Sequence, residues 1–170
     1  ITQIVQGAVQ IGNSDVFAEE KVDDPADAEK IKDNRVCVVG MGPIVNPEVS
    51  VDDIAIADLA KIFTGEITNW NQVGGSDQEI VVINRQAGSG TRAVFEAAVL
   101  GDQESATFQE QDSSGTVAKM VSETPGAISY LAFSYFDDQT KALSVDGVAP
   151  ETANVEDNSW TIWAYEHMYT

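Results

Sequence analysis

The sequence predicts an α/β fold in which a mainly parallel sheet is flanked by helices. Apolar runs of strand length alternate with amphipathic helical patterns along most of the chain, which is typical of this class. The 170 residues are 43% hydrophobic, which is enough to build a buried core. No apolar run reaches the roughly 18 residues that a membrane-spanning helix needs, so we expect a globular protein.

The first part of the chain predicts small elements separated by polar turns. The opening ITQIVQGAV has apolar residues at helical spacing, and QIGNSD predicts a short strand that ends in a turn. An acidic loop and helix follow, interrupted by Pro25. RVCVVGMGPIVN predicts a strand, a glycine break and a second strand, with Cys37 buried as a small hydrophobe. As the single cysteine, Cys37 excludes an intrachain disulfide and a cysteine zinc site.

A helix is predicted for VDDIAIADLAKIFTG, residues 51–65. Acidic residues stand in its first turn, Lys61 lies near its end, and Gly65 follows, as the helix dipole and C-cap chemistry favour. The turn-rich connector after this helix contains Trp70, which we expect to anchor packing, and it leads into the strand EIVVIN.

Two further helices and a strand complete the alternation. RAVFEAAVL predicts a helix with one apolar face, DSSGTVAKMVSETPG predicts a second helix closed by Pro125 and Gly126, and AISYLAF predicts a strand. Ligands in such folds bind at the carboxyl ends of strands. The segment INRQAGSGTR, residues 83–92, occupies such a strand end and is therefore the first place to expect a site.

The chemistry of INRQAGSGTR fits an oxyanion. A helix N-terminus offers N–H groups and partial positive charge, glycines allow close approach, and Ser89 adds a hydroxyl donor. Arg85 adds a planar fork of donors and a full positive charge. The alternative is that Ser89 only caps the helix while Arg85 pairs with a surface acid, and the motif by itself leaves both interpretations open.

The charge balance excludes nucleic acid as a partner. The net charge of −19, from 9 basic and 28 acidic residues, would repel phosphate backbones at long range. The same field opposes any small anion, so an anion site here depends on short hydrogen bonds and on one local cation, Arg85. The acidic surface itself is most simply explained by solubility.

Other motifs that carry chemistry do not fit. No lysine follows Gly90, as a phosphate-binding loop of nucleotide hydrolases would need, and Ser89 touches glycines on both sides, unlike a nucleophile elbow. His167 is the single histidine and is expected to be a surface or packing residue. We therefore expect no catalytic constellation, no metal site and no cofactor.

Five segments together resemble the phosphate-binding component of bacterial ABC phosphate importers. They are GAVQIGNSD, IFTGEITNWNQVGG, INRQAGSGTRAVFE, ETPGAISYLAF and LSVDGVAP, and their order and spacing agree across nearly the whole chain. The resemblance implies a two-lobed fold of the periplasmic-binding-protein type, class II, that closes around one phosphate. In that family the arginine and the Ser-Gly-Thr of the segment INRQAGSGTR hold the anion. The resemblance therefore implies that Arg85, Ser89, Gly90 and Thr91 bind phosphate here. The family also has an aspartate in a turn at the end of a strand, and the residue that matches it here is Asp15.

A carboxylate such as Asp15 is useful beside phosphate because phosphate keeps at least one proton near neutral pH. An ionised carboxylate accepts that proton in a charge-assisted hydrogen bond. Sulfate has no proton to donate, so Asp15 would repel it and select for phosphate. Without the resemblance, Asp15 would be interpreted as a turn or helix cap after Asn13 and Ser14.

The resemblance also implies how the chain is divided, because family members are longer at both ends. We expect part of the first lobe in residues 1–39, the second, phosphate-binding lobe in residues 40–160, and a return crossing toward the first lobe in residues 161–170. Ser129 stands where the family more often has glycine, and we expect it to affect packing only. Exposed strand edges in VCVVG and WTIWAY predict either self-association of such a truncated chain through these segments or disorder of the segments, while residues 45–135 stay compact.

The partners that the resemblance implies are inorganic phosphate and the transmembrane subunits of an ABC importer. The implied location is the extracellular face of the cell membrane, through a lipid anchor, or the periplasm. Two other classes of function stay open: an oxyanion-binding or structural surface module without transport competence, and a phosphate-ester hydrolase.

Overall fold

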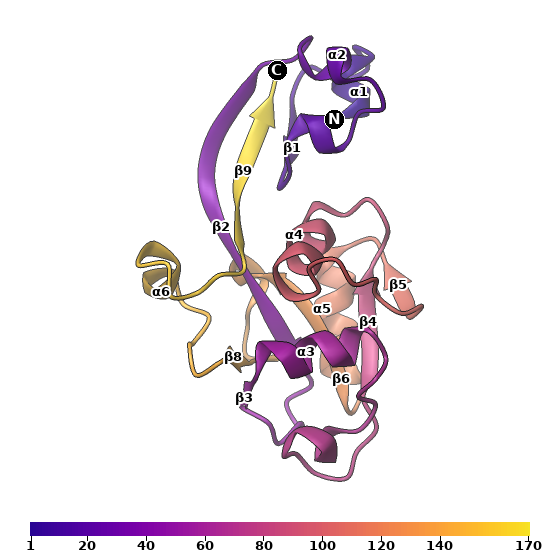
Figure 1. Ribbon diagram of the computed structural model, residues 1–170, viewed down its shortest axis with the longest axis vertical. Helices are drawn as coiled ribbons and strands as arrows, with labels where there is room; N and C mark the ends of the chain where they lie inside the picture. Colours follow the sequence, from indigo (N-terminus) through magenta and orange to yellow (C-terminus); the bar gives the residue numbers. More distant parts are fainter. The chain divides into compact units, whose positions relative to one another are not determined.

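The computed structural model describes residues 1–170, which divide into two compact units (Figure 1). Unit 1 consists of Ile1–Val39 and Trp163–Thr170, and unit 2 consists of Gly40–Ile162. Helices and strands alternate along unit 2, so the predicted α/β class is confirmed. The assignment of the two units to the lobes of a binding protein stays a prediction.

The main sheet of unit 2 has mixed strand directions. β6 (Ala127–Ala132) pairs in parallel with β4 (Val81–Arg85), and β4 pairs in parallel with β5 (Gln109–Gln111). On its other side, β6 pairs antiparallel with the second half of β2 (Asp33–Val45). Because β4, β5 and β6 are parallel, their carboxyl ends lie at one edge of the sheet, and Arg85 is the last residue of β4 there.

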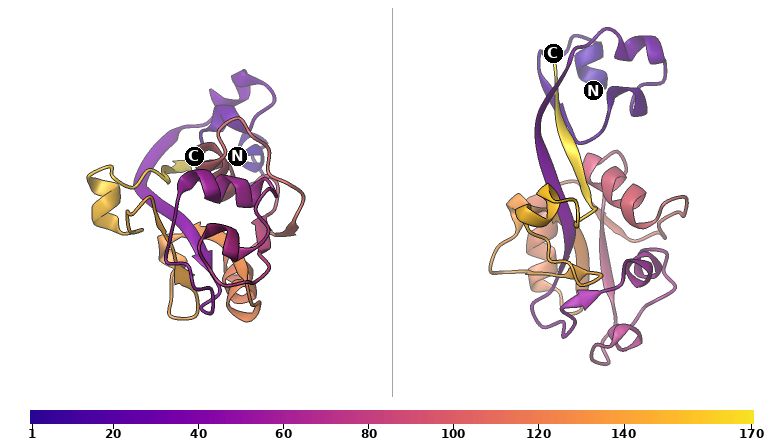
Figure 2. Two further views of the ribbon diagram at one scale, coloured as in Figure 1. Left: turned by 60° about the horizontal axis from the view of Figure 1, so that its bottom comes forward. Right: turned by 60° about the vertical axis from the view of Figure 1, so that its left-hand side comes forward.

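Three helices of unit 2 pack on this sheet or on one another. They are α3 (Ile56–Phe63), α4 (Gly90–Val99) and α5 (Ser114–Glu123), and both α4 and α5 contact β4 and β6 (Figure 1, Figure 2). A serine side chain caps the N-terminus of α4 and of α5. The other elements of unit 2 are short: β3 (Asp53–Ile54), η2 (Trp70–Val73), η3 (Phe133–Tyr135), β7 (Lys141–Ala142), β8 (Ser144–Val145) and α6 (Thr152–Glu156).

The core of unit 2 combines aliphatic packing with a buried polar network. The rings of Phe95 and Tyr130 stack with centroids 3.9 Å apart. The Tyr130 hydroxyl donates to Asn84, whose amide donates to Ser105 at 3.1 Å. Burial raises the pKa of Tyr130, so its hydroxyl keeps the proton that it donates. One aliphatic cluster consists of Ile44, Ile83, Val117, Val121, Ala127 and Leu131.

The glycine break predicted in RVCVVGMGPIVN is wrong, because β2 runs without interruption from Asp33 to Val45. Gly40 and Gly42 serve close packing. A Cβ on Gly40 would lie 2.5 Å from the Phe133 ring, and a Cβ on Gly42 would lie 2.9 Å from the Trp160 ring. Contacts with aromatic rings distant in the sequence therefore explain these glycines.

The helix predicted for residues 51–65 begins later than expected, at Ile56. Asp53 belongs instead to β3, where its carboxylate accepts from the Gly147 amide at 2.8 Å. Asp52 pairs with Lys141 at 2.7 Å rather than standing in a helical turn. The short parallel pairing of β3 with β8 thus overrides the local helical pattern.

Cys37 is exposed, so the prediction that it is buried is wrong. Its neighbours Val36 and Val38 are 54% and 48% exposed. Such an apolar run is typical of a core strand, but the first half of β2 leaves these side chains exposed.

Unit 1 is organised around β9 (Trp163–Tyr169). β1 (Gly12–Ser14) pairs antiparallel with β9, with Ser14 opposite His167. His167 is buried and its Nδ1 lies 2.8 Å from Asp33, which makes it a packing residue. The short helices of this unit are α1 (Thr2–Val5), η1 (Ala18–Glu20) and α2 (Pro25–Ala28).

Candidate anion-binding site

The turn between β4 and α4 has the geometry that its sequence predicts. Gly88 has φ +91°, a left-handed conformation that glycine adopts without the strain of a Cβ. Ser89 is the N-cap of α4, and its Oγ accepts from the Arg92 amide at 3.3 Å. Gly90 and Thr91 form the first turn of the helix, where backbone N–H groups have no acceptor within the helix. The turn therefore gathers hydrogen-bond donors and the positive end of the helix dipole at the N-terminus of α4.

Arg85 lies at the start of this turn and is only 7% exposed. Its Nη1 donates to Ser114 Oγ at 2.9 Å, and its Nη2 donates to the Asp112 carbonyl at 3.1 Å. Both acceptors are neutral, so neither compensates the charge of the guanidinium. The Nε atom is buried and has no hydrogen-bond partner. Burial of an uncompensated cation is energetically unfavourable, and an anion bound beside the guanidinium would offset this penalty.

Arg92 differs from Arg85 because two carboxylates compensate its charge. Its Nε donates to Glu96 at 2.7 Å and its Nη1 donates to Glu110 at 2.6 Å. Burial lowers the pKa of Arg92, but the hydrogen bonds with Glu110 and Glu96 outweigh it and raise the pKa overall. Nη1 also donates to the Arg85 carbonyl at 2.9 Å, which ties α4 to the end of β4. Arg92 thus holds the turn together.

Sequence reasoning missed Ser114 and Asp112, which position the Arg85 guanidinium. Ser114 is the first residue of α5, and Asp112 stands just before the serine that caps this helix. The run DSSG signals a helix start, but nothing local indicates that this start faces β4. The parallel pairing of β4 with β5, in which Arg85 lies opposite Gln111, brings the two segments together.

Asp15 belongs to unit 1 and directly follows β1. Continuing the register of β1 and β9 places it opposite Glu166, and the two side chains share a hydrogen bond. Burial, followed by this hydrogen bond and the charge of Asp15, raises the pKa of Glu166 to about 7. Unit 2 brings Arg85, Ser89, Gly90 and Thr91 together, and unit 1 presents Asp15 beside a second carboxyl group.

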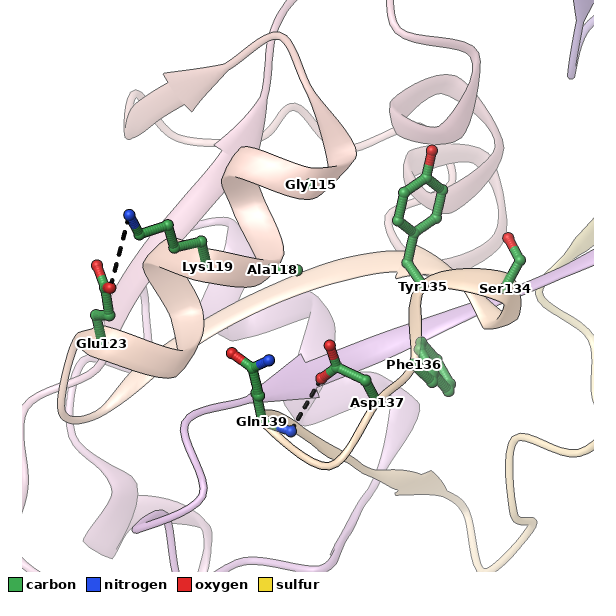
Figure 3. Close-up of a pocket in the computed structure, with 9 residues that line it drawn as sticks. All are labelled: Gly115, Ala118, Lys119, Glu123, Ser134, Tyr135, Phe136, Asp137 and Gln139. Atoms are coloured by element: carbon green, nitrogen blue, oxygen red, sulfur yellow. Dashed lines mark hydrogen bonds and ion pairs between the residues drawn. The ribbon is translucent and has the colours of Figure 1, made fainter.

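Unit 2 also contains a pocket of about 440 Å³ (Figure 3). Its polar side chains include Lys119, which pairs with Glu123, and Asp137, which accepts from the Gln139 amide. None of the predicted anion ligands lines it, and its residues are Gly115, Ala118, Lys119, Glu123, Ser134, Tyr135, Phe136, Asp137 and Gln139.

Two further observations concern the whole chain. No group of three or more histidine, cysteine or acidic side chains is arranged to hold a metal ion. None of the helices combines the length and apolar character that crossing a membrane requires.

Comparisons with known proteins found a matching family model, similar proteins and similar solved structures. A family model described as the PBP superfamily domain matches residues 1–170. The chain is 53% identical over 171 residues to the phosphate-binding protein PstS of Bacillus subtilis, which covers 100% of this chain and 56% of that protein. It is 34% identical over 131 residues to PstS of Borreliella burgdorferi, covering 70% of this chain and 47% of that protein. The chain thus spans about half the length of these relatives.

A weaker similarity involves a protein named for an enzyme, alkaline phosphatase L of Pseudomonas aeruginosa. It is 28% identical over 128 residues, which is 57% of this chain and 33% of that protein. Among solved structures, a phosphate ABC transporter substrate-binding protein from Clostridium perfringens, described with bound phosphate, has a TM-score of 0.90 and 33% identity. That match covers 99% of this chain and 68% of the solved chain.

Proposed function

Because the chain belongs to the PBP superfamily, we propose that it binds inorganic phosphate as the substrate-binding component of an ABC importer. The observation that carries the proposal is Arg85. In a protein of net charge −19, its guanidinium is buried at a helix N-terminus, with neutral acceptors and an unpartnered Nε. The relatives named for phosphate binding supply the identity of the anion.

In the proposed complex, Arg85 supplies the charge and the α4 turn supplies neutral donors. The Ser89 Oγ already accepts from the Arg92 amide, so its hydroxyl proton is available to a ligand. The amides of Gly90 and Thr91 belong to the first turn of α4 and suit the oxygens of a tetrahedral anion. The Arg85 fork suits bidentate contact with two of these oxygens.

Asp15 is proposed to accept the proton that phosphate retains near neutral pH. Phosphate offers this proton and sulfate does not, so the carboxylate favours the first anion and repels the second. This assignment rests on the family resemblance and on the position of Asp15 at the end of β1.

The proposed partners are the transmembrane subunits of the importer, which would receive the phosphate. The proposed location is outside the cytoplasmic membrane, at the cell surface through a lipid anchor or in the periplasm. The proposed role is binding and not catalysis. Release of phosphate from a monoester at a rate that depends on Arg85 would contradict this part of the proposal.

The test compares two variants that each remove one positive charge, Arg85→Met and Lys119→Met, in the full-length protein. Lys119 is an exposed residue of α5 with 72% side-chain exposure. We expect Arg85→Met to weaken phosphate binding at least about 100-fold by calorimetry, because two charge-assisted hydrogen bonds contribute about 1.5 to 3 kcal/mol each. Lys119→Met should bind like the parent protein. Equal affinities of the parent and Arg85→Met would overturn the proposed site.

A further inference from the structure

We propose that Ser114 is a positioning residue of the phosphate site, which holds the Arg85 guanidinium through a neutral oxygen and thereby leaves its positive charge to the ligand. This inference rests on the proposed function and deepens it. Ser114 acts through Arg85 and is not itself a ligand. Both residues belong to unit 2, so the arrangement is complete within one compact unit.

The strand pairing of unit 2 brings Ser114 to Arg85. β4 and β5 are parallel, with Arg85 opposite Gln111, and the chain leads from the end of β5 directly into α5, whose first residue is Ser114. The Ser114 Oγ accepts from Arg85 Nη1 at 2.9 Å, and the Asp112 carbonyl accepts from Nη2 at 3.1 Å. Asp112 contributes only a backbone atom, so Ser114 is the contact that a substitution can change.

The backbone of Arg85 is held by other residues. Its amide donates to the Asn84 side-chain oxygen at 2.9 Å, and its carbonyl accepts from Arg92 Nη1 at 2.9 Å. Asn84 is buried, and its own amide donates to Ser105 at 3.1 Å. These contacts do not involve α5. A substitution at Ser114 therefore changes what the guanidinium contacts and leaves the end of β4 in place.

The neutrality of the Ser114 oxygen matters for the charge of the site. A hydroxyl oxygen orients the guanidinium by a hydrogen bond but brings no negative charge. Arg85 is 7% exposed and its Nε has no partner, so the cation is buried with part of its donor capacity unused. Arg92 shows the alternative, since Glu96 and Glu110 compensate its charge. A carboxylate partner cancels much of the attraction that a guanidinium exerts on a second anion.

Ser113, the preceding residue, provides a matched control. Its hydroxyl is engaged by the helix, because Oγ accepts from the Thr116 amide at 3.4 Å, whereas the hydroxyl of Ser114 is engaged by Arg85. Ser113 is also exposed. Aspartate is a favourable N-cap, so Ser113→Asp adds a negative charge to the same helix end and keeps the cap. The two aspartate variants therefore differ in whether the new carboxylate stands at the position that contacts Arg85.

The experiment measures phosphate affinity by calorimetry in the full-length protein and in four variants. Ser114→Ala removes one of the two contacts that orient the guanidinium, so binding should weaken about fivefold, and Ser114→Thr, which keeps the hydroxyl, should bind like the parent. Ser114→Asp should weaken binding at least about tenfold, because its carboxylate competes with phosphate for Arg85. Ser113→Asp should stay within about twofold of the parent, because solvent and salt screen an exposed charge.

Two further measurements separate positioning from a merely structural role. Without phosphate, Ser114→Asp should unfold at a higher temperature than Ser113→Asp, because only the first variant gives the buried Arg85 a countercharge. Stability and affinity then change in opposite directions, which a structural contact alone would not produce. By NMR, the Arg85 Nε–H signal should shift when phosphate is added to the parent and shift less in Ser114→Asp.

The outcomes distinguish this inference from the proposed function. Parent-like affinity in Ser114→Ala or in Ser114→Asp would overturn the role of Ser114 and leave phosphate binding at Arg85 standing. An equal loss of affinity in Ser113→Asp and Ser114→Asp would also overturn it, because the effect would then come from charge at the helix end. A parent protein that does not bind phosphate would overturn the proposed function and this inference with it.

Discussion

At the scale of single residues, two arginines seven positions apart show how surroundings assign different tasks to the same side chain. Arg92 donates to Glu96 and Glu110, so its charge is compensated within the protein. Arg85 donates to a hydroxyl and a carbonyl and has a buried Nε without a partner. The first arrangement stabilises a turn and the second favours an anionic ligand.

Asp15→Asn tests the selectivity of the proposed site. The neutral amide no longer repels an anion without protons, so we expect weaker discrimination between phosphate and sulfate. Competition binding in the full-length protein at neutral pH measures this ratio, with Asp23→Asn as a control for the lost charge. An unchanged ratio would show that Asp15 does not discriminate between the two anions.

Glu166 gives a pH dependence of stability whose sign can be worked out. Its pKa in the folded protein is about 7, above the ordinary 4.5, so the folded state binds the proton more tightly than the unfolded state. The stabilising contribution is therefore complete below the ordinary pKa and is lost as the pH rises through the folded pKa. We expect thermal unfolding scans to show the parent losing stability relative to Glu166→Gln between about pH 5 and pH 7. Parallel curves for the two proteins would contradict the raised pKa.

At the scale of elements, two helices begin with the same chemistry but are assigned different roles. Ser89 caps α4 and Ser113 caps α5, each accepting from a backbone amide three residues later. The caps form from local sequence, because a short hydroxyl side chain reaches the first-turn amides. Of these two helix starts, only that of α4 contains residues proposed to bind the anion.

The matched variants Ser89→Ala and Ser113→Ala separate capping from binding. Each loses one cap, so we expect both to lower the free energy of unfolding by about 1 kcal/mol. Ser89→Ala should also weaken phosphate binding about tenfold, because a hydroxyl donor to the ligand is lost. Chemical denaturation and calorimetry measure the two effects. If both variants bound phosphate equally well, Ser89 would be a cap and no more.

At the scale of the whole molecule, exposed apolar residues and a large net charge act against each other. Val36 and Val38 are about half exposed on β2, and Ile11 is 59% exposed. Exposed apolar strand residues favour association with another chain, whereas the net charge of −19 opposes it. Salt screens the repulsion and leaves the apolar attraction in place.

We therefore expect the 170-residue chain to self-associate as its concentration rises, and more strongly at high salt. Val36→Lys combined with Val38→Lys should reduce the association, because lysines on exposed strands oppose pairing. Light scattering over a concentration series at low and high salt measures this effect. A particle that stays monomeric under all these conditions would contradict the expectation.

The α/β class, the strand that ends at Arg85 and the capped turn of Ser89 could be predicted because each depends on neighbouring residues. Hydrophobic period, a serine cap and a glycine with positive φ act within a few positions of the chain. Gly40 and Gly42 show the opposite case. Their sequence suggests that the strand is interrupted. In the structure, each lies against an aromatic ring from a distant part of the chain, which leaves no room for a Cβ.

By itself, the sequence determined that a buried-core α/β protein presents an arginine and a Ser-Gly-Thr turn at a strand end. Only the tertiary structure decided that Arg85 donates to Ser114, that Cys37 is exposed, and that Ser14 lies opposite His167. The reason is physical. Caps and periodicity arise from local geometry, whereas burial, register and charge compensation depend on which distant segments pack together.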